Sequence, residues 1–358
     1  MRTIAVVLGT RPEAITLAPV VRALRDDPRF APVVISTGER RRPLHETLDA
    51  FGLSPDLDLR IMPPRQTPAE VTCRALRGLA EHLVPMGADA VLVRGDTATA
   101  LAGAIAGFHH RIPVAHAGVR DGKPFPEGAN RRLVAQLAAL HLAATPDDRD
   151  NLVKEGVEPD RIVVTGDTAA DALRWAGELA PGYGHPDLAD LDADPRRVVL
   201  AVAHASWPRW RELGRALAVL AGDPAVRVVA PLPSDPAVRE ALLPVIGRHP
   251  GITVVDPLPY VSGCRLRRRA DVILTDGAGE EDPGPARPTL LLRDTEGIVA
   301  AVTELLAGPR PRPTPYGDGR ATGRTIAALA RFLDGGPAEV RARRGPRPGP
   351  SPPPRPGW

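Results

Sequence analysis

The sequence predicts an α/β protein with two doubly wound, Rossmann-like domains that face each other across a cleft. Three observations lead to this fold class. Short β-branched apolar runs alternate with helical patterns, which is typical of a parallel sheet with helices on both faces. The alternation recurs in both halves of the 358-residue chain, which is long enough for two domains with their own cores. Residues 178–195 lie between the halves, and their Pro, Gly and Asp content predicts a linker.

In the first half, apolar runs bounded by turn residues predict buried strands. These runs are Ile4–Leu8, Val33–Thr37, Ala90–Arg94, Val114–His116, Leu140–Ala144 and Ile162–Thr165. The segments between them have helix-like spacing of apolar residues. They are Leu17–Leu24, Leu44–Phe51, Pro68–Leu83, Thr99–Phe108 and Asn130–Ala139.

The second half repeats this alternation. Its predicted strands are Val198–Val202, Val226–Ala230, Ile252–Asp256, Val272–Thr275 and Thr289–Leu292, and its predicted helices are Arg209–Ala221, Ala237–Gly247 and Ile298–Ala307. We therefore expect one domain over residues 1–175 and a second over residues 176–335. Residues 336–358 are mostly Pro, Arg and Gly and predict a disordered tail, with a Pro-rich ligand for a partner's aromatic groove as the alternative.

Composition argues against nucleic-acid and membrane partners. The net charge of +3 comes from 46 basic and 43 acidic residues, and residues 341–358 contain arginines but no acids, so the rest of the chain is close to neutral. No apolar run reaches the roughly 18 residues that span a bilayer. The N-terminus reads as a buried strand and not as a signal peptide, so we expect a cytoplasmic protein. Cys73 and Cys264 have no metal-ligand spacing.

Polar residues follow several predicted strands, at the edge where open α/β sheets bind ligands. A turn before a helix offers backbone N–H groups and the positive end of the helix dipole to an anion. Basic side chains would add to this attraction, and carboxylates in a water-poor cleft suit proton transfer. The candidates are Arg11, Asp96, His116, Glu127, Arg131, His204, Asp276, Gly277, Ala278, Gly279, Glu280 and Glu281.

Each candidate also has an ordinary structural explanation. An aspartate after a strand, such as Asp96, is often a helix N-cap, and a single histidine such as His204 is often a hydrogen-bonded structural residue. A loop glutamate such as Glu127 is usually exposed, and Gly277–Gly279 is common in any turn from a strand to a helix. Walker, GxGxxG, HExxH and GxSxG motifs are absent from the sequence. Together the candidates predict a nucleotide-linked substrate that loses or gains a proton.

Six segments in order resemble the non-hydrolysing UDP-N-acetylglucosamine (UDP-GlcNAc) 2-epimerases. They are LGTRPEAITLAPVVRAL, VRGDTATALAGAIAG, PEGANRRL, VVTGDTAADAL, LTDGAGEE and PYGDG, between about residues 3 and 330. The resemblance implies the two-domain fold of glycosyltransferase B type, with the final helix, near Thr322–Leu333, crossing back to the first domain. It also implies a homodimer that converts UDP-GlcNAc to UDP-N-acetylmannosamine (UDP-ManNAc). That reaction removes the C2 proton, eliminates UDP to give 2-acetamidoglucal, and adds UDP back, with no metal or redox cofactor.

The same resemblance implies roles for the candidates. Arg11 would lie at the UDP group, and Asp96 and Glu127 would act as acid and base. Arg131 would bind substrate, His204 would act in catalysis by stabilising the diphosphate, and Glu280 or Glu281 would hold the ribose hydroxyls. The UDP site of the second domain would also include Gly277, Ala278 and Gly279.

Several positions depart from the family pattern. Thr16 stands where the family has lysine, HAGVR at residues 116–120 lacks a third catalytic glutamate, and AHASWPR at residues 203–209 lacks two arginines and a glutamate. Gly263 stands where an aromatic residue stacks on uracil. At the family's second, activating UDP-GlcNAc site, Arg65 is kept, but a glutamine–histidine pair and a further histidine are replaced. Their replacements are Glu39, Arg40 and Pro233.

These losses leave three readings open. The first is an active epimerase without activation by its substrate, with amino-sugar synthesis in secondary metabolism as a hypothesis for its setting. The second is a weakened or inactive homologue that binds a sugar nucleotide or a partner. The third is a glycosyltransferase or a hydrolase on the same scaffold.

Overall fold

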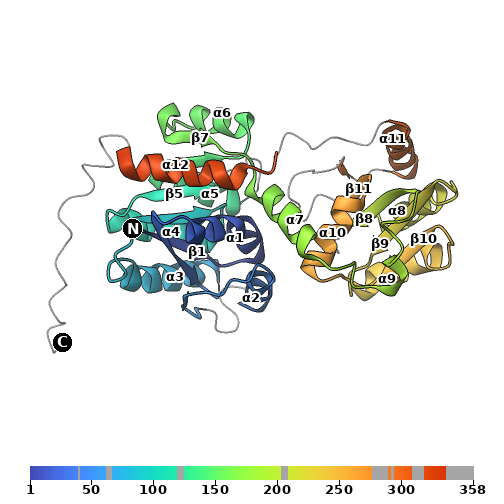
Figure 1. The fold of residues 1–358 in the computed structure, drawn as a ribbon, viewed down its shortest axis with the longest axis horizontal. Coiled ribbons are helices and arrows are strands. Elements are labelled where there is room, and N and C mark those ends of the chain that lie inside the picture. Colours follow the sequence, from blue (N-terminus) through green and yellow to red (C-terminus); the bar gives the residue numbers. More distant parts are fainter. Residues whose placement is uncertain are drawn as a thin grey trace.

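The computed structural model describes residues 1–38, 41–61, 67–118, 125–202, 209–275, 289–291, 294–308 and 318–335. Within these ranges two parallel sheets form two lobes that lie side by side (Figure 1). The α/β class and the two doubly wound sheets expected from the sequence are confirmed.

The first sheet has seven strands in the order β3-β2-β1-β4-β5-β6-β7. Its strands are β1 (Arg2–Leu8), β2 (Phe30–Ser36), β3 (Leu57–Asp58), β4 (Ala90–Arg94), β5 (Val114–Ala117), β6 (Leu140–Ala143) and β7 (Ile162–Val164). All neighbouring strands run parallel. The order reverses between β1 and β4, and this switch point is where doubly wound sheets bind ligands.

Both faces of this sheet are covered, because β1 buries Ile4, Val6 and Leu8 on one side and Ala5 and Val7 on the other. The helices of the first face are α1 (Arg11–Asp26), α2 (Arg41–Ala50), α7 (Thr168–Leu179) and α12 (Ala321–Gly335). Those of the second face are α3 (Pro68–Leu83), α4 (Ala98–His109) and α5 (Glu127–Leu137). Helix α6 (Pro146–Lys154) follows β6, and a 3₁₀ turn, η1 (Pro159–Arg161), precedes β7.

The second sheet repeats this order with five strands, β10-β9-β8-β11-β12. Its strands are β8 (Arg197–Val202), β9 (Val226–Pro231), β10 (Ile252–Val255), β11 (Val272–Thr275) and β12 (Thr289–Leu291). Its helices are α8 (Trp210–Leu220), α9 (Pro236–Ile246), α10 (Tyr260–Arg269) and α11 (Thr295–Ala307), and η2 (Pro186–Leu188) precedes β8. The second switch point therefore lies between β8 and β11.

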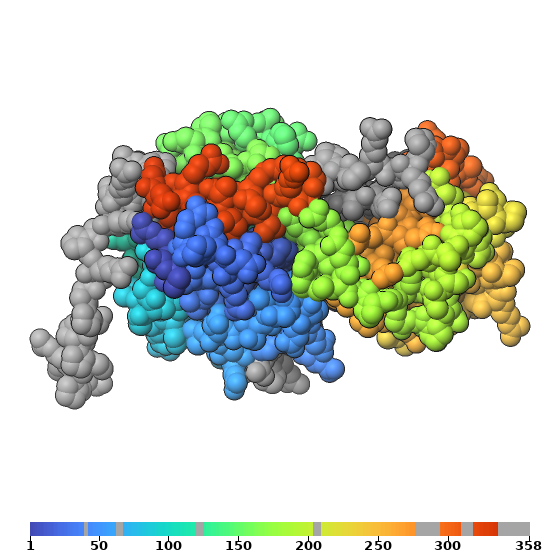
Figure 2. Space-filling view, in the orientation of Figure 1, coloured from blue at the N-terminus to red at the C-terminus, as the bar shows by residue number. Residues whose placement is uncertain are grey.

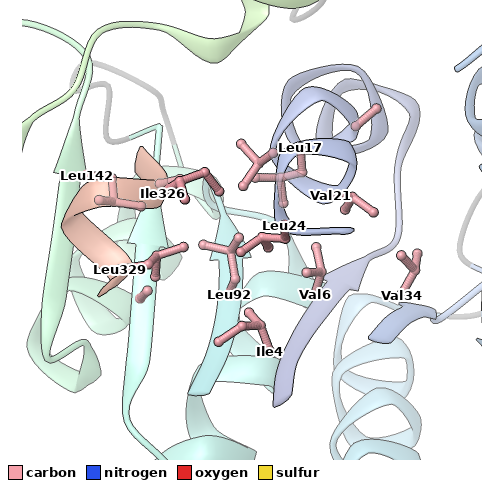
Figure 3. Close-up of a cluster of buried hydrophobic side chains, with 14 of the residues drawn as sticks. Ile4, Val6, Leu17, Val21, Leu24, Val34, Leu92, Leu142, Ile326 and Leu329 are labelled. Carbon is pink, nitrogen blue, oxygen red and sulfur yellow. The ribbon is translucent and has the colours of Figure 1, made fainter. Parts of the chain in front are cut away.

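The last helix, α12, returns to the first lobe. Its Ile326 and Leu329 lie in one apolar cluster with Leu92 of β4 and Leu142 of β6 (Figure 3), and its surface adjoins that of α1 (Figure 2). The backbone N–H of Thr322 donates to Asp171 of α7 at 2.7 Å. The crossing that the resemblance implied is confirmed.

The region between the lobes differs from the sequence expectation. The predicted boundary after residue 175 falls inside α7. The segment 178–195, predicted as a linker, packs against the second lobe. Tyr183, Leu188 and Leu191 of that stretch are buried in the core of the second sheet, because its apolar residues pack while its Pro, Gly and Asp residues shape the turns between them. The division at residues 175 and 335 stays a prediction.

Two further expectations concern the whole chain. In the ranges given above, no helix is both long and apolar enough to cross a membrane. The tail predicted over 336–358 lies outside the described residues.

Candidate functional site

Two turns lie next to each other at the switch point of the first sheet. The β1–α1 turn is Gly9 and Thr10, and the β4–α4 turn is Gly95–Thr97. Because β1 and β4 are parallel neighbours, the two turns leave the sheet at the same edge. Predicted site residues belong to or follow both: Arg11 opens α1, and Asp96 is in the β4–α4 turn.

The β1–α1 turn is held by Glu13, which sits in the first turn of α1 and is 1% exposed. Its Oε2 accepts hydrogen bonds from the backbone N–H groups of Gly9 at 2.6 Å and Thr10 at 2.8 Å. These are N–H groups that a helix start cannot satisfy within itself. The GTRPE motif thus uses its glutamate to fix its own backbone, while Arg11 at the helix start points to the second lobe.

The β4–α4 turn is held from three sides. Gly95 has a positive φ of 75°, which glycine adopts without strain. Nε2–H of His116, in β5, donates to the carbonyl of Gly95 at 2.8 Å, and the side-chain amide of Asn130, in α5, donates to the carbonyl of Asp96 at 3.1 Å. Thr97 caps α4 by accepting from the N–H of Ala100 at 3.0 Å. Asp96 itself is 5% exposed, so a fixed backbone holds its carboxylate.

Glu127 is the first residue of α5 and is half-buried. It lies one helical turn before Asn130, and residues three apart share a helix face. Since Asn130 contacts the backbone of Asp96, α5 brings the second predicted acid to the same edge of the sheet as the first. Two carboxylates at one edge, in different settings, are the arrangement that general acid–base chemistry requires.

Arg131 is placed less simply than the resemblance implied. Its side chain is 2% exposed, and both terminal nitrogens donate to the carboxylate of Glu155, with Nη1 2.9 Å from Oε2. Glu155 ends α6 and is 23% exposed. The ion pair therefore joins α5 to α6 beneath the site. Whether Arg131 also contacts substrate stays a prediction.

Two buried histidines lie beside this site. The rings of His116 and His141 meet edge-on, with centroids 6.1 Å apart. Burial lowers the pKa of His116 to about 4, against the opposing effect of its bond to Gly95, with Arg131 and Arg94 lowering it further and Asp96 raising it. Burial also lowers the pKa of His141 to about 3, with help from His116 and Arg161. Both histidines are neutral at pH 7.

A cavity of about 250 Å³ opens between the carboxyl edges of the two sheets. Arg11 enters it from the first lobe, and its guanidinium lies 5.8 Å from the ring centroid of Tyr260. The second lobe supplies the other walls from the ends of its strands and from α10. They include Val202, Pro231, Pro233, Leu258, Tyr260, Gly263, Cys264 and Arg267. A Cβ at Gly263 would meet open space. Arg11 and Arg267 place two cationic side chains at this cavity, which suits an anionic ligand.

Aromatic rings join the lobes behind this cavity. Phe51, after α2, stacks on Trp175 of α7 with centroids 4.8 Å apart and planes 9° apart. Tyr260 tilts against Phe51 at 5.7 Å, and the guanidinium of Arg22 lies 4.7 Å from the Trp175 ring centroid. Offset aromatic pairs contribute about 0.5–1.5 kcal/mol beyond their buried area. The wall of the cavity is thus anchored in the first lobe.

Arg11, Asp96 and Glu127 follow strands or open helices at the same edge of the first sheet, Arg131 lies one turn further along α5, and their roles in the site stay predictions. Of the other candidates, His116 holds the β4–α4 turn, and the rest lie outside the described ranges: His204, Asp276, Gly277, Ala278, Gly279, Glu280 and Glu281. Sequence reasoning missed Glu13, Asn130 and Tyr260. The capping-box spacing from Thr10 to Glu13 is a signal for the first, whereas the other two depend on contacts between distant segments. Among the described residues, no group of three His, Cys, Asp or Glu side chains could hold a metal ion.

Fold and site define a class of protein: a two-lobed α/β protein of glycosyltransferase B type with a cavity between its lobes. The chain belongs to the UDP-N-acetylglucosamine 2-epimerase family, whose pattern matches residues 22–303. It is 38% identical to the UDP-N-acetylglucosamine 2-epimerase of Escherichia coli O157:H7, over 90% of this chain and 97% of that protein. The enzyme of the same name from Bacillus subtilis is also 38% identical, over 90% and 93%.

A solved structure agrees with this assignment. The UDP-GlcNAc 2-epimerase of Neisseria meningitidis, bound to UDP-GlcNAc, superposes with a TM-score of 0.76 at 30% identity, over 92% of this chain and all of that one. The family resemblance and the fold expected from the sequence are thereby confirmed.

Proposed function

We propose that this protein converts UDP-GlcNAc to UDP-ManNAc by inverting C2 of the sugar. The observation that supports this most strongly is that helix α5, which begins at Glu127, is joined through Asn130 to the backbone of Asp96 at the sheet edge from which Arg11 enters the cavity between the lobes. A base that removes a carbon-bound proton and an acid that returns one must both reach the sugar. The cationic side chain of Arg11 suits the diphosphate that leaves.

The reaction balances without an external reactant. A carboxylate takes the C2 proton, the C1–O bond to UDP breaks, and the electron pair of the C2–H bond forms the C1=C2 double bond of 2-acetamidoglucal. UDP then adds back to C1 while a proton is delivered to the opposite face of C2. Asp96 and Glu127 carry these protons in the proposal, and His204 stabilises the diphosphate.

Arg11 binds UDP in this proposal. Its side chain faces the cavity and the ring of Tyr260, and it stands at the N-terminus of the 16-residue helix α1. The UDP contacts of Gly277, Ala278, Gly279, Glu280 and Glu281 rest on the sequence resemblance alone, as does the substrate contact of Arg131. A homodimer and a cytoplasmic location are also parts of the proposal that rest on sequence.

We further propose that substrate does not activate the enzyme. By resemblance, the activating site of the family needs a glutamine–histidine pair, and the sequence has Glu39 and Arg40 there, both outside the described residues; the like charge of a glutamate and a diphosphate opposes binding. A hyperbolic saturation curve for UDP-GlcNAc is the expected result. A sigmoidal dependence of the rate on UDP-GlcNAc concentration would contradict it.

The test of the proposed function separates it from a binding protein and from a transferase or hydrolase. Purified protein is incubated with UDP-GlcNAc, and UDP-ManNAc is quantified by its anomeric NMR signal. Asp96→Asn and Glu127→Gln are each expected to lower the rate by about 10²–10⁴-fold, as for loss of one acid–base group. The exposed carboxylate of Glu158 provides a control, since Glu158→Gln should keep the full rate. Free UDP with free sugar and no UDP-ManNAc would indicate a hydrolase instead.

A further inference from the structure

Glu13 is a buried carboxylate that the reaction above does not use. Its two oxygens serve different segments of the chain. Oε2 accepts from the N–H groups of Gly9 and Thr10 in the β1–α1 turn, and Oε1 accepts from the hydroxyl of Thr97 in the β4–α4 turn at 2.6 Å. Thr97 is 84 residues away in sequence. One side chain therefore links the two turns at the switch point.

This arrangement goes beyond the capping of a helix. Helix α3 begins with the same residue types, Thr67, a proline and Glu70, and among the described residues its glutamate accepts from Thr67, at 2.8 Å from the N–H and 3.0 Å from the hydroxyl. Glu70 is exposed. A cap requires neither the burial of Glu13 nor its second oxygen on Thr97. A comparison of Glu13 with Glu70 therefore separates the link to Thr97 from the capping of a helix.

The link lies in a tightly packed place. A Cβ at Gly9 would come within 2.2 Å of the hydroxyl oxygen of Thr99 and 2.9 Å of that of Thr37, and these two hydroxyls bond to each other at 2.9 Å. The β1–α1 turn therefore rests directly on the first residues of α4. With packing below and Glu13 beside it, the turn has little freedom to move relative to β4.

We propose that Glu13 is a positioning residue, which holds the β1–α1 turn against the β4–α4 turn and so fixes Arg11 relative to Asp96. The kinetic part of this proposal rests on the proposed function. A misplacement of about 1 Å between substrate-binding and reacting groups can cost about 100-fold in rate. Since both oxygens of Glu13 are bonded to the two turns, its effect passes through Arg11 and Asp96, which those turns carry.

The kinetic test compares two glutamates in the same capping motif. Glu13→Ala is expected to lower kcat about 100-fold, while Glu70→Ala leaves kcat unchanged. Glu13→Gln should recover most of the rate, because its oxygen can accept from Gly9 and Thr10 while its amide donates to the hydroxyl of Thr97. A purely structural role predicts that Glu13→Ala protein that remains folded keeps the kcat of the Glu70→Ala protein, and that result would overturn the proposal.

A second readout needs no activity. Thr97→Val removes the hydroxyl that holds Oε1 and leaves Gly9 and Thr10 untouched. Amide hydrogen exchange at Gly9 and Thr10 is expected to accelerate in Thr97→Val and to stay unchanged in Thr67→Val, the matched change in α3. Unchanged exchange in Thr97→Val would overturn the link itself. A wild-type protein that forms no UDP-ManNAc would instead refute the proposed function, and the exchange result would still decide the role of Glu13.

Discussion

The guanidinium of Arg11 lies 5.8 Å from the ring centroid of Tyr260, so a residue of α1 in the first lobe meets a residue of α10 in the second inside the cavity. A cation over a ring contributes about 0.5–2 kcal/mol, depending on how far both are desolvated. The contact orients the side chain that is proposed to bind UDP.

Replacing Tyr260 tests this contact. Tyr260→Leu is expected to raise the Kd for UDP by about 2- to 30-fold, which is the cation–π contribution expressed as an affinity. Tyr260→Phe keeps the ring and should stay within about 2-fold of the wild type, because the phenyl face still attracts the cation. Titration calorimetry with UDP measures both. Equal weakening in both variants would show that the hydroxyl and not the ring matters.

Gly9 predicts a loss of stability from overpacking. In Gly9→Ala the new Cβ would overlap the side chain of Thr99, with 2.2 Å to its hydroxyl oxygen and 2.8 Å to its Cβ. Overpacking of this kind typically costs about 1–3 kcal/mol. Gly323→Ala is the control, because a Cβ there meets nothing within 4 Å and alanine favours the helix by about 0.5–1 kcal/mol. Urea unfolding should move the two midpoints in opposite directions, and a shared direction would contradict the packing argument.

The histidine pair predicts acid sensitivity. In the folded protein the pKa of His116 is about 4 and that of His141 about 3, below the unfolded value of about 6.5. Below pH 6.5 the unfolded chain therefore binds protons that the folded chain does not, and stability falls as pH falls. The stability is fully present above pH 6.5. As the pH falls from about 6.5 to its folded pKa, each histidine lowers the free energy of unfolding by about 1.4 kcal/mol per pH unit.

Urea unfolding at pH 8, 6 and 5 checks this dependence. His141→Leu should reduce the slope of the unfolding free energy against pH by the contribution of about one proton, and should change stability little at pH 8. His109→Leu, at an exposed position, should keep the wild-type slope. If His141→Leu loses stability equally at all three values, the ring is held in place for packing alone.

The Arg131–Glu155 pair predicts the cost of removing one partner of a buried ion pair. Glu155→Gln leaves the guanidinium of Arg131 without its carboxylate, and breaking a buried ion pair in this way costs about 3 kcal/mol, the lower end of the usual range because Glu155 is 23% exposed. Thermal unfolding measures the loss. If Arg131 also binds substrate, KM for UDP-GlcNAc rises in the folded variant. An unchanged KM would show that Arg131 supports the structure of the site and does not bind substrate.

The sequence predicted the strands well because buried parallel strands are short apolar runs between turn residues. Ala90–Arg94 and Val272–Thr275 match β4 and β11 in both ends. Strand β3 was missed, since two residues carry no pattern and Leu57 and Asp58 are fixed by pairing with β2. Helix α10 was missed because its arginines obscure the apolar face. Arg265 and Arg269 are taken up by carbonyls of Ala180, Leu191 and other residues of the stretch predicted as a linker.

The site was predictable to the extent that its residues follow strands. Arg11 and Asp96 come directly after β1 and β4, so topology alone places them together. The partners that hold them could not be predicted. Glu155 lies 24 residues after Arg131, and Asn130 lies 34 residues after Asp96, and these pairs meet only because α5 packs across the sheet edge. The order of the strands thus predicts where the site residues lie, whereas their hydrogen-bond partners depend on how the helices pack.

Deuterium exchange at C2 tests the central claim most directly. The protein is incubated with UDP-GlcNAc in D2O, and the C2 proton and the anomeric signals are followed by NMR. The proposed reaction predicts that the C2 proton signal disappears as UDP-ManNAc appears, since proton removal and return are separate steps on opposite faces. A C2 proton that persists while line broadening shows UDP-GlcNAc to be bound would contradict the account and indicate a binding protein.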